Sequence, residues 1–357
     1  MTERLTIANL TGDLVVYRDL RPCDPALPGL EDLRAALGLP ANLLPRKRNA
    51  EYARVMLELL RVVQARRSDE PLQLLLVGGD TDNDRMMAAH LRAVSGLPVY
   101  AFLGVDRLDT DPVITWEGDT ATANRWALLE PWLDEVAQRY GTPLEQMPWH
   151  AAALLLDIDK TLLGPRGRND GPINDSRASA ALDVATDLYG EDLATALFHA
   201  FYDTLCQKEF HPLTLDNQDY VVYITMLLAG EVFSIADIRQ GMVDGSLATF
   251  AQVLTAAEPR LPSVLHELHI SIHAAHAAGD PTPFKAFRHA EFAATVERML
   301  DGRLLLCREV YELGQRLVAL GSICMAASDK PDEASLPSEK QLAAGMLPLH
   351  RTSALIG

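Results

Sequence analysis

The chain has 357 residues, which is longer than a typical single domain, and 48% of them are hydrophobic, so we expect two compact units with extensive cores. Its formal net charge of −17 argues against nucleic-acid binding, because that affinity depends on Lys and Arg neutralising phosphates. The four cysteines form no C-x-x-C pair, which argues against a disulfide scaffold or a zinc knuckle.

The amino terminus lacks the basic-then-apolar pattern of a secretion signal. No apolar stretch approaches the roughly 20 residues that are required to span a bilayer. We therefore expect a cytoplasmic protein that does not associate with membranes and acts on a small polar substrate. A homo-oligomer is compatible with the sequence.

The amino-terminal half alternates between apolar runs and helical patterns. Leu5–Tyr17 could complete the core or pair with another chain, and Asn49–Gln64 is predicted to be an amphipathic helix. Leu72–Val77 is a short apolar run closed by two glycines, which is typical of a buried parallel strand. A predicted helix, Asp84–Val94, and a predicted strand, Pro98–Leu103, complete a βαβ unit.

A third strand follows in the same pattern. Trp126–Arg139 is predicted to be helical, and Ala152–Leu156 is again short and apolar. Strands that alternate with helices predict an α/β fold with a doubly wound, mostly parallel sheet.

Strand-like runs almost disappear between residues 165 and 310, where helical segments such as Arg177–Leu188, Ala194–Leu205 and Ala290–Leu300 dominate. A helix at Glu309–Leu320 and a strand at Ile323–Ser328 then restore the α/β pattern. We therefore predict an all-helical domain, 165–310, inserted between two parts of an α/β core, 1–164 and 311–357.

Two carboxylates follow the third predicted strand. Asp157 and Asp159 come directly after it, and Thr161 and a turn at Gly164–Arg168 follow. Loops at the carboxyl ends of parallel strands are where α/β sheets bind ligands. At such a position Asp157 could attack phosphorus as a nucleophile, while Asp159 exchanges a proton with the leaving and entering oxygens.

This part of the sequence resembles motif I of the haloacid dehalogenase-like (HAD) hydrolase superfamily. It has four apolar residues, then D-x-D-x-T, then a glycine-containing turn and a long insertion. The resemblance implies a HAD-like Rossmannoid core with a helical cap domain. It also implies a phosphatase that hydrolyses a small phosphorylated metabolite through an aspartyl-phosphate on Asp157, with Thr161 in the substrate site. The second acid, Asp159, is typical of phosphatases and phosphotransferases of the superfamily rather than of its dehalogenases.

Gly79–Asp84, which follows the Leu72–Val77 run, resembles a second motif of the superfamily, which is acidic. The resemblance implies that Asp80 and Asp84 join Asp157 and Asp159 in a magnesium site, and hard oxygen ligands suit Mg²⁺. The alternative is an ordinary Asp/Asn-rich turn or a helix N-cap.

The motifs occur in an unusual order, because the acidic motif precedes motif I. The segment after Ser328 is too short to carry the remaining motifs, so we expect a circularly permuted HAD core. In that core Ser328 resembles motif II, whose hydroxyl contacts the phosphoryl group. Lys47 resembles motif III, whose ammonium neutralises phosphoryl charge, and Lys330 and Lys340 are the rival candidates.

The inserted domain carries candidate substrate contacts. Pro262–Ala278 is a predicted helix with four histidines along one stripe: His266, His269, His273 and His276. That stripe is compatible with a polar margin of the packed face, with a substrate surface that includes His269 and His273, or with a transition-metal site. Lys285 and Arg288 are candidates for binding an anionic leaving group, or belong to an amphipathic surface.

Other functions remain open from the sequence. The aspartyl-phosphate could pass to a second hydroxyl, as in a phosphotransferase or mutase. Asp80-Thr-Asp82 is a D-x-D that could hold a metal-bound nucleotide sugar in a glycosyltransferase. A non-catalytic HAD-like binding protein could also retain the sheet.

Overall fold

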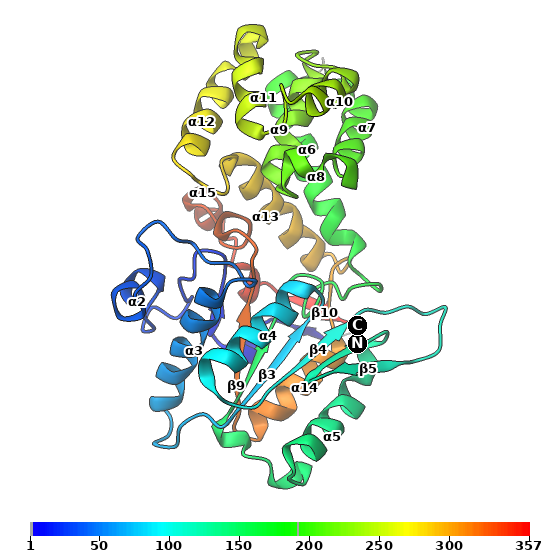
Figure 1. The fold of residues 1–357 in the computed structure, drawn as a ribbon. Coiled ribbons are helices and arrows are strands. Elements are labelled where there is room, and N and C mark those ends of the chain that lie inside the picture. Colours follow the sequence, from blue (N-terminus) through cyan, green and yellow to red (C-terminus); the bar gives the residue numbers. More distant parts are fainter. Residues whose placement is uncertain (1–2, 191–192) are drawn as a thin grey trace. The chain divides into compact units, whose positions relative to one another are not determined.

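The computed structural model describes residues 3–190 and 193–357 (Figure 1). They form two compact units. The first consists of the chain up to Ile173 together with Thr295–Leu336 and Leu342–Gly357. The second unit is Asn174–Ala294 together with Pro337–Gln341. The second unit is therefore inserted into the first, and it is shorter at both ends than the expected helical domain, 165–310.

The first unit contains a seven-stranded sheet with the order β2-β9-β7-β3-β4-β6-β5. Its strands are β2 (Val15–Val16), β3 (Leu74–Gly79), β4 (Val99–Gly104), β5 (Ile114–Glu117), β6 (Thr120–Ala123), β7 (Ala152–Leu156) and β9 (Ile323–Ala327). Neighbouring strands are parallel, except for the antiparallel pair β5 and β6. The predicted α/β class with a mostly parallel sheet is confirmed.

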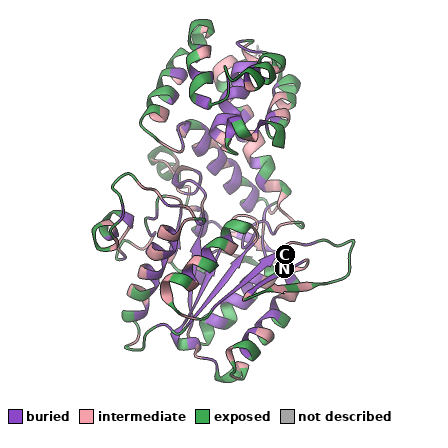
Figure 2. Ribbon diagram, viewed as in Figure 1, coloured by how far each residue is buried: buried purple, intermediate pink, exposed green. Residues whose placement is uncertain are grey.

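Helices pack on both faces of this sheet, and its strands are largely buried, as Figure 2 shows. One face is covered by α2 (Leu30–Leu37), α3 (Ala50–Ala65) and α4 (Asp82–Ser95). The other contacts α1 (Ala8–Thr11), α5 (Leu129–Tyr140) and α14 (Arg308–Ala319). Because successive side chains of a strand point to opposite faces, a strand covered on both sides must be apolar throughout, as all five residues of β7 are.

The two glycines that were predicted to close the first strand are instead its last residues, Gly78 and Gly79. A Cβ on Gly79 would lie 2.4 Å from the side chain of Asp84, so only glycine allows the strand to run this close to the start of α4. Thr81 begins α4 as its N-cap, and Asp84 completes a capping box. The tight turn between β3 and α4 follows from these residues.

A second, smaller sheet of the first unit has the order β1-β10-β8, formed by β1 (Arg4–Leu5), β8 (Leu305–Leu306) and β10 (Ala354–Ile356). β1 pairs with β10, and β2 pairs with β9. The Leu5–Tyr17 segment, whose partner the sequence left open, therefore completes the sheets of its own chain.

The described residues of the second unit contain helices and no strands. The helices are α6 (Gly171–Tyr189), α7 (Thr195–Leu205), α8 (His211–Thr214), α9 (Gln218–Ala229), α10 (Ile235–Asp244), α11 (Phe250–Ala257), α12 (His266–Ala277), α13 (Lys285–Leu300) and the short α15 (Glu339–Ala343), with α6, α13 and α15 extending beyond the unit's bounds. Helix α9 is buried along most of its length and forms the centre of this core. In the part of the chain described, no helix combines the length and apolar character that crossing a bilayer requires.

The buried strand β7 supports a stability prediction. We expect Leu155→Ala, at a fully buried position of β7, to lower the free energy of unfolding by about 2–5 kcal/mol, because it removes packed methyl groups and leaves a cavity. Leu108→Ala, at a side chain that is 73% exposed, serves as the control and should change it by less than about 0.5 kcal/mol. All four tryptophans lie in the first unit, so urea unfolding followed by tryptophan fluorescence reports on this core. Equal effects of the two substitutions would contradict the prediction.

Candidate active site

The candidate site lies where three neighbouring strands end. β7 lies between β9 and β3, and the register aligns Leu156 with Gly78 on one side and Ala326 on the other. Parallel strands in this register end at the same edge of the sheet. Asp80, Asp157 and Ser328, which follow the three strands, are therefore brought to one edge from distant parts of the sequence.

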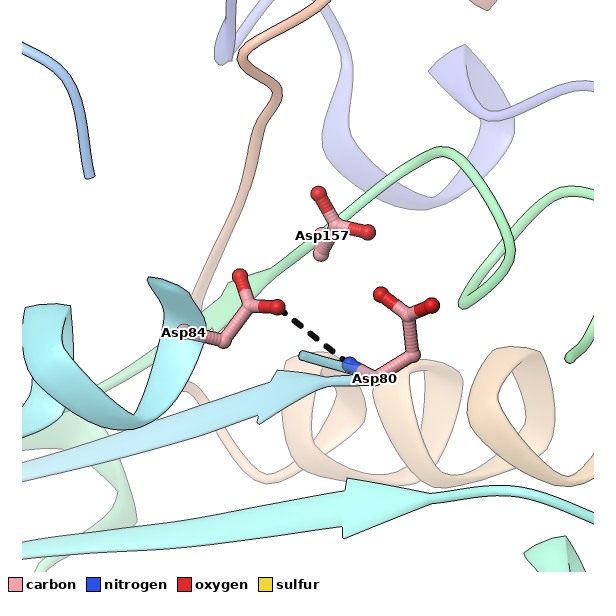
Figure 3. Close-up of side chains that lie close together, drawn as sticks. All are labelled: Asp80, Asp84 and Asp157. Carbon is pink, nitrogen blue, oxygen red and sulfur yellow. Dashed lines mark hydrogen bonds between the residues drawn. The ribbon is translucent and has the colours of Figure 1, made fainter. Parts of the chain in front are cut away.

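Three carboxylates gather at this edge. Asp80, Asp84 and Asp157 each offer an oxygen atom, and these atoms all lie within 4.8 Å of one another. In Figure 3, Asp80 and Asp157 project toward a common space, while Asp84 turns back toward the backbone nitrogen of Asp80. Oxygen donors grouped in this way are the kind of ligand set that a hard divalent cation uses.

Lys47 joins two of these carboxylates. Its Nζ lies 2.8 Å from Asp84 Oδ1 and 2.5 Å from Asp157 Oδ1. Only 3% of the Lys47 side chain is exposed, so its ammonium has exchanged water for these two partners. Of the three lysines weighed from the sequence, Lys47 is the one that contacts Asp157.

Burial and charge oppose each other in this cluster. Burial lowers the pKa of Lys47, but Asp157 and Asp84 outweigh it, and the pKa is held well above its ordinary value. Burial raises the pKa of Asp157 well above the usual range, with Asp84 and Asp80 adding to the rise against the opposing effect of Lys47. Burial also raises the pKa of Asp80 to about 6, despite the nearby Arg166.

Both carboxylate oxygens of Asp84 accept hydrogen bonds. Its Oδ1 accepts from Lys47, and its Oδ2 accepts from the backbone nitrogens of Asp80 and Thr81 and from Thr81 Oγ1, the last at 2.8 Å. Burial raises its pKa, but the Lys47 ammonium and these hydrogen bonds hold the pKa below its ordinary value. This carboxylate therefore fixes the β3–α4 turn and Lys47, and Asp80 and Asp157 are better placed to bind a metal.

Asp159 lies outside the group of three carboxylates. Its Oδ2 lies 3.3 Å from Nζ of Lys330, whose side chain is buried. The two lysines are thus divided between the two acids of the D-x-D motif, because Lys47 contacts Asp157. The predicted ligation of a metal by the Asp159 carboxylate remains a prediction.

Two hydroxyl groups predicted for the site are buried. Ser328 follows β9, and its Oγ accepts a hydrogen bond of 3.1 Å from the backbone nitrogen of Lys330, which leaves its proton able to serve a second partner. Thr161 is fully buried, and its Oγ1 makes no hydrogen bond within residues 3–190 and 193–357. A buried hydroxyl without a partner is costly, and this group is still able to form a hydrogen bond.

Sequence reasoning missed two neighbours of the cluster. Arg166, in the glycine-containing turn, forms an ion pair through Nε with Asp80 Oδ2, and the Asp80 side chain is only 4% exposed. Asp329 accepts a hydrogen bond from the backbone nitrogen of Lys47 and lies 3.2 Å from Arg46 Nε. Only the position of Arg166 soon after motif I could have suggested it, and nothing in the sequence indicated the role of Asp329.

The candidate cations on α13 belong to the second unit. Arg288 is buried, with its guanidinium 2.5 Å from Asp219 and 2.7 Å from Glu291. Its charge is thus balanced inside the helical core, which gives no support to the predicted contact with a leaving group. Lys285 is more exposed and lies 3.0 Å from Asp280.

The histidines of α12 have unequal environments. His269 is buried, and its Nδ1 lies 2.6 Å from the hydroxyl of Tyr223, whereas His273 is exposed and stacks on His269 with the ring centroids 5.7 Å apart. Burial lowers the pKa of His269, and His273 lowers it further. In the described residues the stripe does not form a group of three metal-ligating atoms, and its predicted contact with substrate stays a prediction.

Comparisons with protein families, with curated proteins and with solved structures find no match to this chain. The resemblance to the HAD superfamily therefore depends on the motifs and on the arrangement of their residues.

The buried ammonium generates a prediction that depends on pH. We expect Lys47→Met to lower the free energy of unfolding by about 3–5 kcal/mol at pH 8, because Asp84 and Asp157 then lack their buried counter-ion. Without Lys47 the lowered pKa of Asp84 rises, and the pKa of Asp157, which burial already raises, rises further, so the folded state binds protons more tightly. The deficit should therefore shrink as the pH falls from 8 to 5.

Tryptophan-detected urea unfolding at the two pH values measures this effect. Lys340→Met, which removes an exposed lysine of α15, is the matched control and should change the stability little at either pH. A deficit for Lys47→Met that is independent of pH would contradict the assignment of Lys47 as the counter-ion.

Proposed function

We propose that this chain is a magnesium-dependent phosphatase with a circularly permuted HAD-like core, which hydrolyses a small phosphorylated metabolite through an aspartyl-phosphate on Asp157. The observation that carries the proposal is the contact of Lys47 with Asp157 beside Asp80. A nucleophilic carboxylate, an ammonium and a second acid from a neighbouring strand are the groups that the resemblance requires together.

The order of the strands supports the permutation. β9, β7 and β3 are consecutive in the sheet, although β3 comes first in the chain and β9 last. A chain read from β7 through β9, then β2 and the Lys47 loop to β3, would pass motifs I, II, III and the acidic motif in the usual order of the superfamily. β1 pairs with β10, so the first and last strands lie side by side at the point where that reading joins them.

The position of the second unit supports a cap. It is helical and enters the chain shortly after motif I, which is where the superfamily carries caps of its helical class. A cap that closes over the core would exclude water and select the leaving group, which favours a small substrate.

The residues present fit a magnesium ion. Asp80 and Asp157 supply hard oxygen donors from two turns. Burial raises the pKa of both acids, and a divalent cation would offset the cost of ionising them there. When bound, Mg²⁺ would supply countercharge to the phosphoryl oxygens. Asp84, held by Lys47 and the α4 cap, would support this pair rather than bind the metal.

The chemistry divides between the two acids of the motif. Asp157 attacks phosphorus, the phosphorus–oxygen ester bond breaks, and the leaving oxygen takes a proton from Asp159. Asp159 then accepts a proton from water as the water attacks the aspartyl-phosphate, which releases phosphate and restores Asp157. Lys47, Ser328 and Thr161 would stabilise the charge on the phosphoryl oxygens.

The glycosyltransferase alternative gains no support from the second acid of its D-x-D. The Asp82 side chain is 89% exposed and contacts Arg85, whereas Asp80 is buried in the cluster. A shared metal would need both acids to face one point. Asp82 is therefore a suitable control position for the phosphatase assay.

The proposal predicts metal-dependent phosphate release. We expect the purified chain to release phosphate from at least one member of a panel of sugar phosphates, nucleotides and phosphorylated hydroxy acids when Mg²⁺ is present. Asp157→Asn should abolish turnover, because the amide is a poor nucleophile. Asp80→Asn should lower kcat by about 10²- to 10³-fold through loss of electrostatic stabilisation, with release measured colorimetrically.

Asp82→Asn is the matched control and should keep the activity within about threefold of the unsubstituted chain, because an exposed side chain contributes little. Activity that survives Asp157→Asn but is lost in Asp82→Asn would reject the phosphatase and favour the glycosyltransferase. Phosphate release without Mg²⁺ would reject the metal, and absence of release from the whole panel would reject hydrolysis.

A further inference from the structure

The Arg166 guanidinium is held by one carboxylate of the cluster. Its Nε pairs with Asp80, and no other hydrogen bond or ion pair of this side chain occurs among the described residues. The Arg166 side chain is 35% exposed, in contrast to the buried Asp80. The Arg166 side chain is therefore partly open to solvent, although its partner is not.

The backbone of Arg166 is fixed independently of this ion pair. Its nitrogen donates to Lys160 O at 2.8 Å, and its carbonyl accepts from Asp106 N at 2.9 Å and from Trp126 Nε1 at 3.3 Å. The following residue, Gly167, has φ +81°, and a Cβ there would lie 2.1 Å from Asp106 O. The side chain can thus leave Asp80 without any change in the loop that carries it.

A cation between Asp80 and Asp157 would compete with Arg166. The guanidinium occupies Asp80 Oδ2, and Figure 3 shows the Asp80 carboxylate as part of the group of three acids. Three carboxylates face two cations in this cluster, Lys47 and Arg166, and Lys47 is already engaged by Asp84 and Asp157. Arg166 is therefore the cation that a divalent ion would replace.

We propose that Arg166 is a displaceable counter-ion: it neutralises Asp80 in the metal-free protein, and binding of a divalent metal releases it. This inference rests on the metal site of the proposed function. The released guanidinium would lie beside the site on the same loop as Thr161, where an anionic group of the substrate could take it. Metal binding and anion binding would then strengthen each other.

Metal binding to the full chain tests this role without any substrate. We expect the Kd for Mn²⁺, measured by electron paramagnetic resonance at constant pH and ionic strength, to fall about tenfold in Arg166→Gln, because Asp80 no longer has a competing cation. Arg85→Gln is the matched control, since it removes the same charge near the β3–α4 turn without touching the cluster. The Kd of this control for Mn²⁺ should change by less than about twofold, because salt screens a charge outside the cluster.

A second measurement separates competition from a general loss of structure. In the presence of a chelator, Arg166→Gln should unfold at a lower temperature than the unsubstituted chain, because a buried carboxylate is left unpaired. At saturating Mn²⁺ the two proteins should unfold at the same temperature, because the guanidinium no longer contacts Asp80 in either.

An unchanged or weaker affinity in Arg166→Gln, or an equal gain in Arg85→Gln, would overturn the proposal. A stability deficit of Arg166→Gln that persists at saturating Mn²⁺ would also overturn it, as would the absence of Mn²⁺ binding in both proteins. Tighter binding in a chain that releases no phosphate would support the counter-ion role while rejecting the phosphatase, so the two proposals can fail separately.

Discussion

The buried ion triad of Lys47, Asp84 and Asp157 is the constraint on which the rest of the site depends. An ammonium with almost no exposure to water is tolerated only where carboxylates replace its hydration. Its two partners follow different strands, and Lys47 itself comes from the loop before α3. The triad therefore fixes three chain segments relative to one another, and it works only if β3 and β7 end at the same edge of the sheet.

Local sequence features serve this constraint. Gly79 lets β3 approach Asp84 closely, and Thr81 holds the carboxylate of Asp84 by capping α4. Asp80, at the same turn, is left with a buried carboxylate, and Arg166 supplies its charge balance from the loop after β7. A site with this many opposed charges is costly to assemble for stability alone, which is typical of functional sites.

The elements that positioned the site could be predicted from sequence because their signals are local. The apolar runs of β3, β4, β7 and β9 are recognisable without partners, whereas the β5–β6 hairpin was missed because it is short and its edge strand is half exposed. Side-chain pairing was harder to predict. Arg288 was a candidate for binding the leaving group or part of an amphipathic surface. It pairs with Asp219, a partner far away in the sequence that no spacing rule could identify.

The central claim is that Asp157 accepts the phosphoryl group. The most direct measurement is the mass of the acid-quenched chain, followed by peptide mapping, after incubation with Mg²⁺ and acetyl phosphate as a small phosphoryl donor. The account predicts a gain of one phosphoryl group on the peptide that contains Asp157, and no gain in Asp157→Asn. A phosphoryl group on another residue, or none on the folded chain, would contradict it.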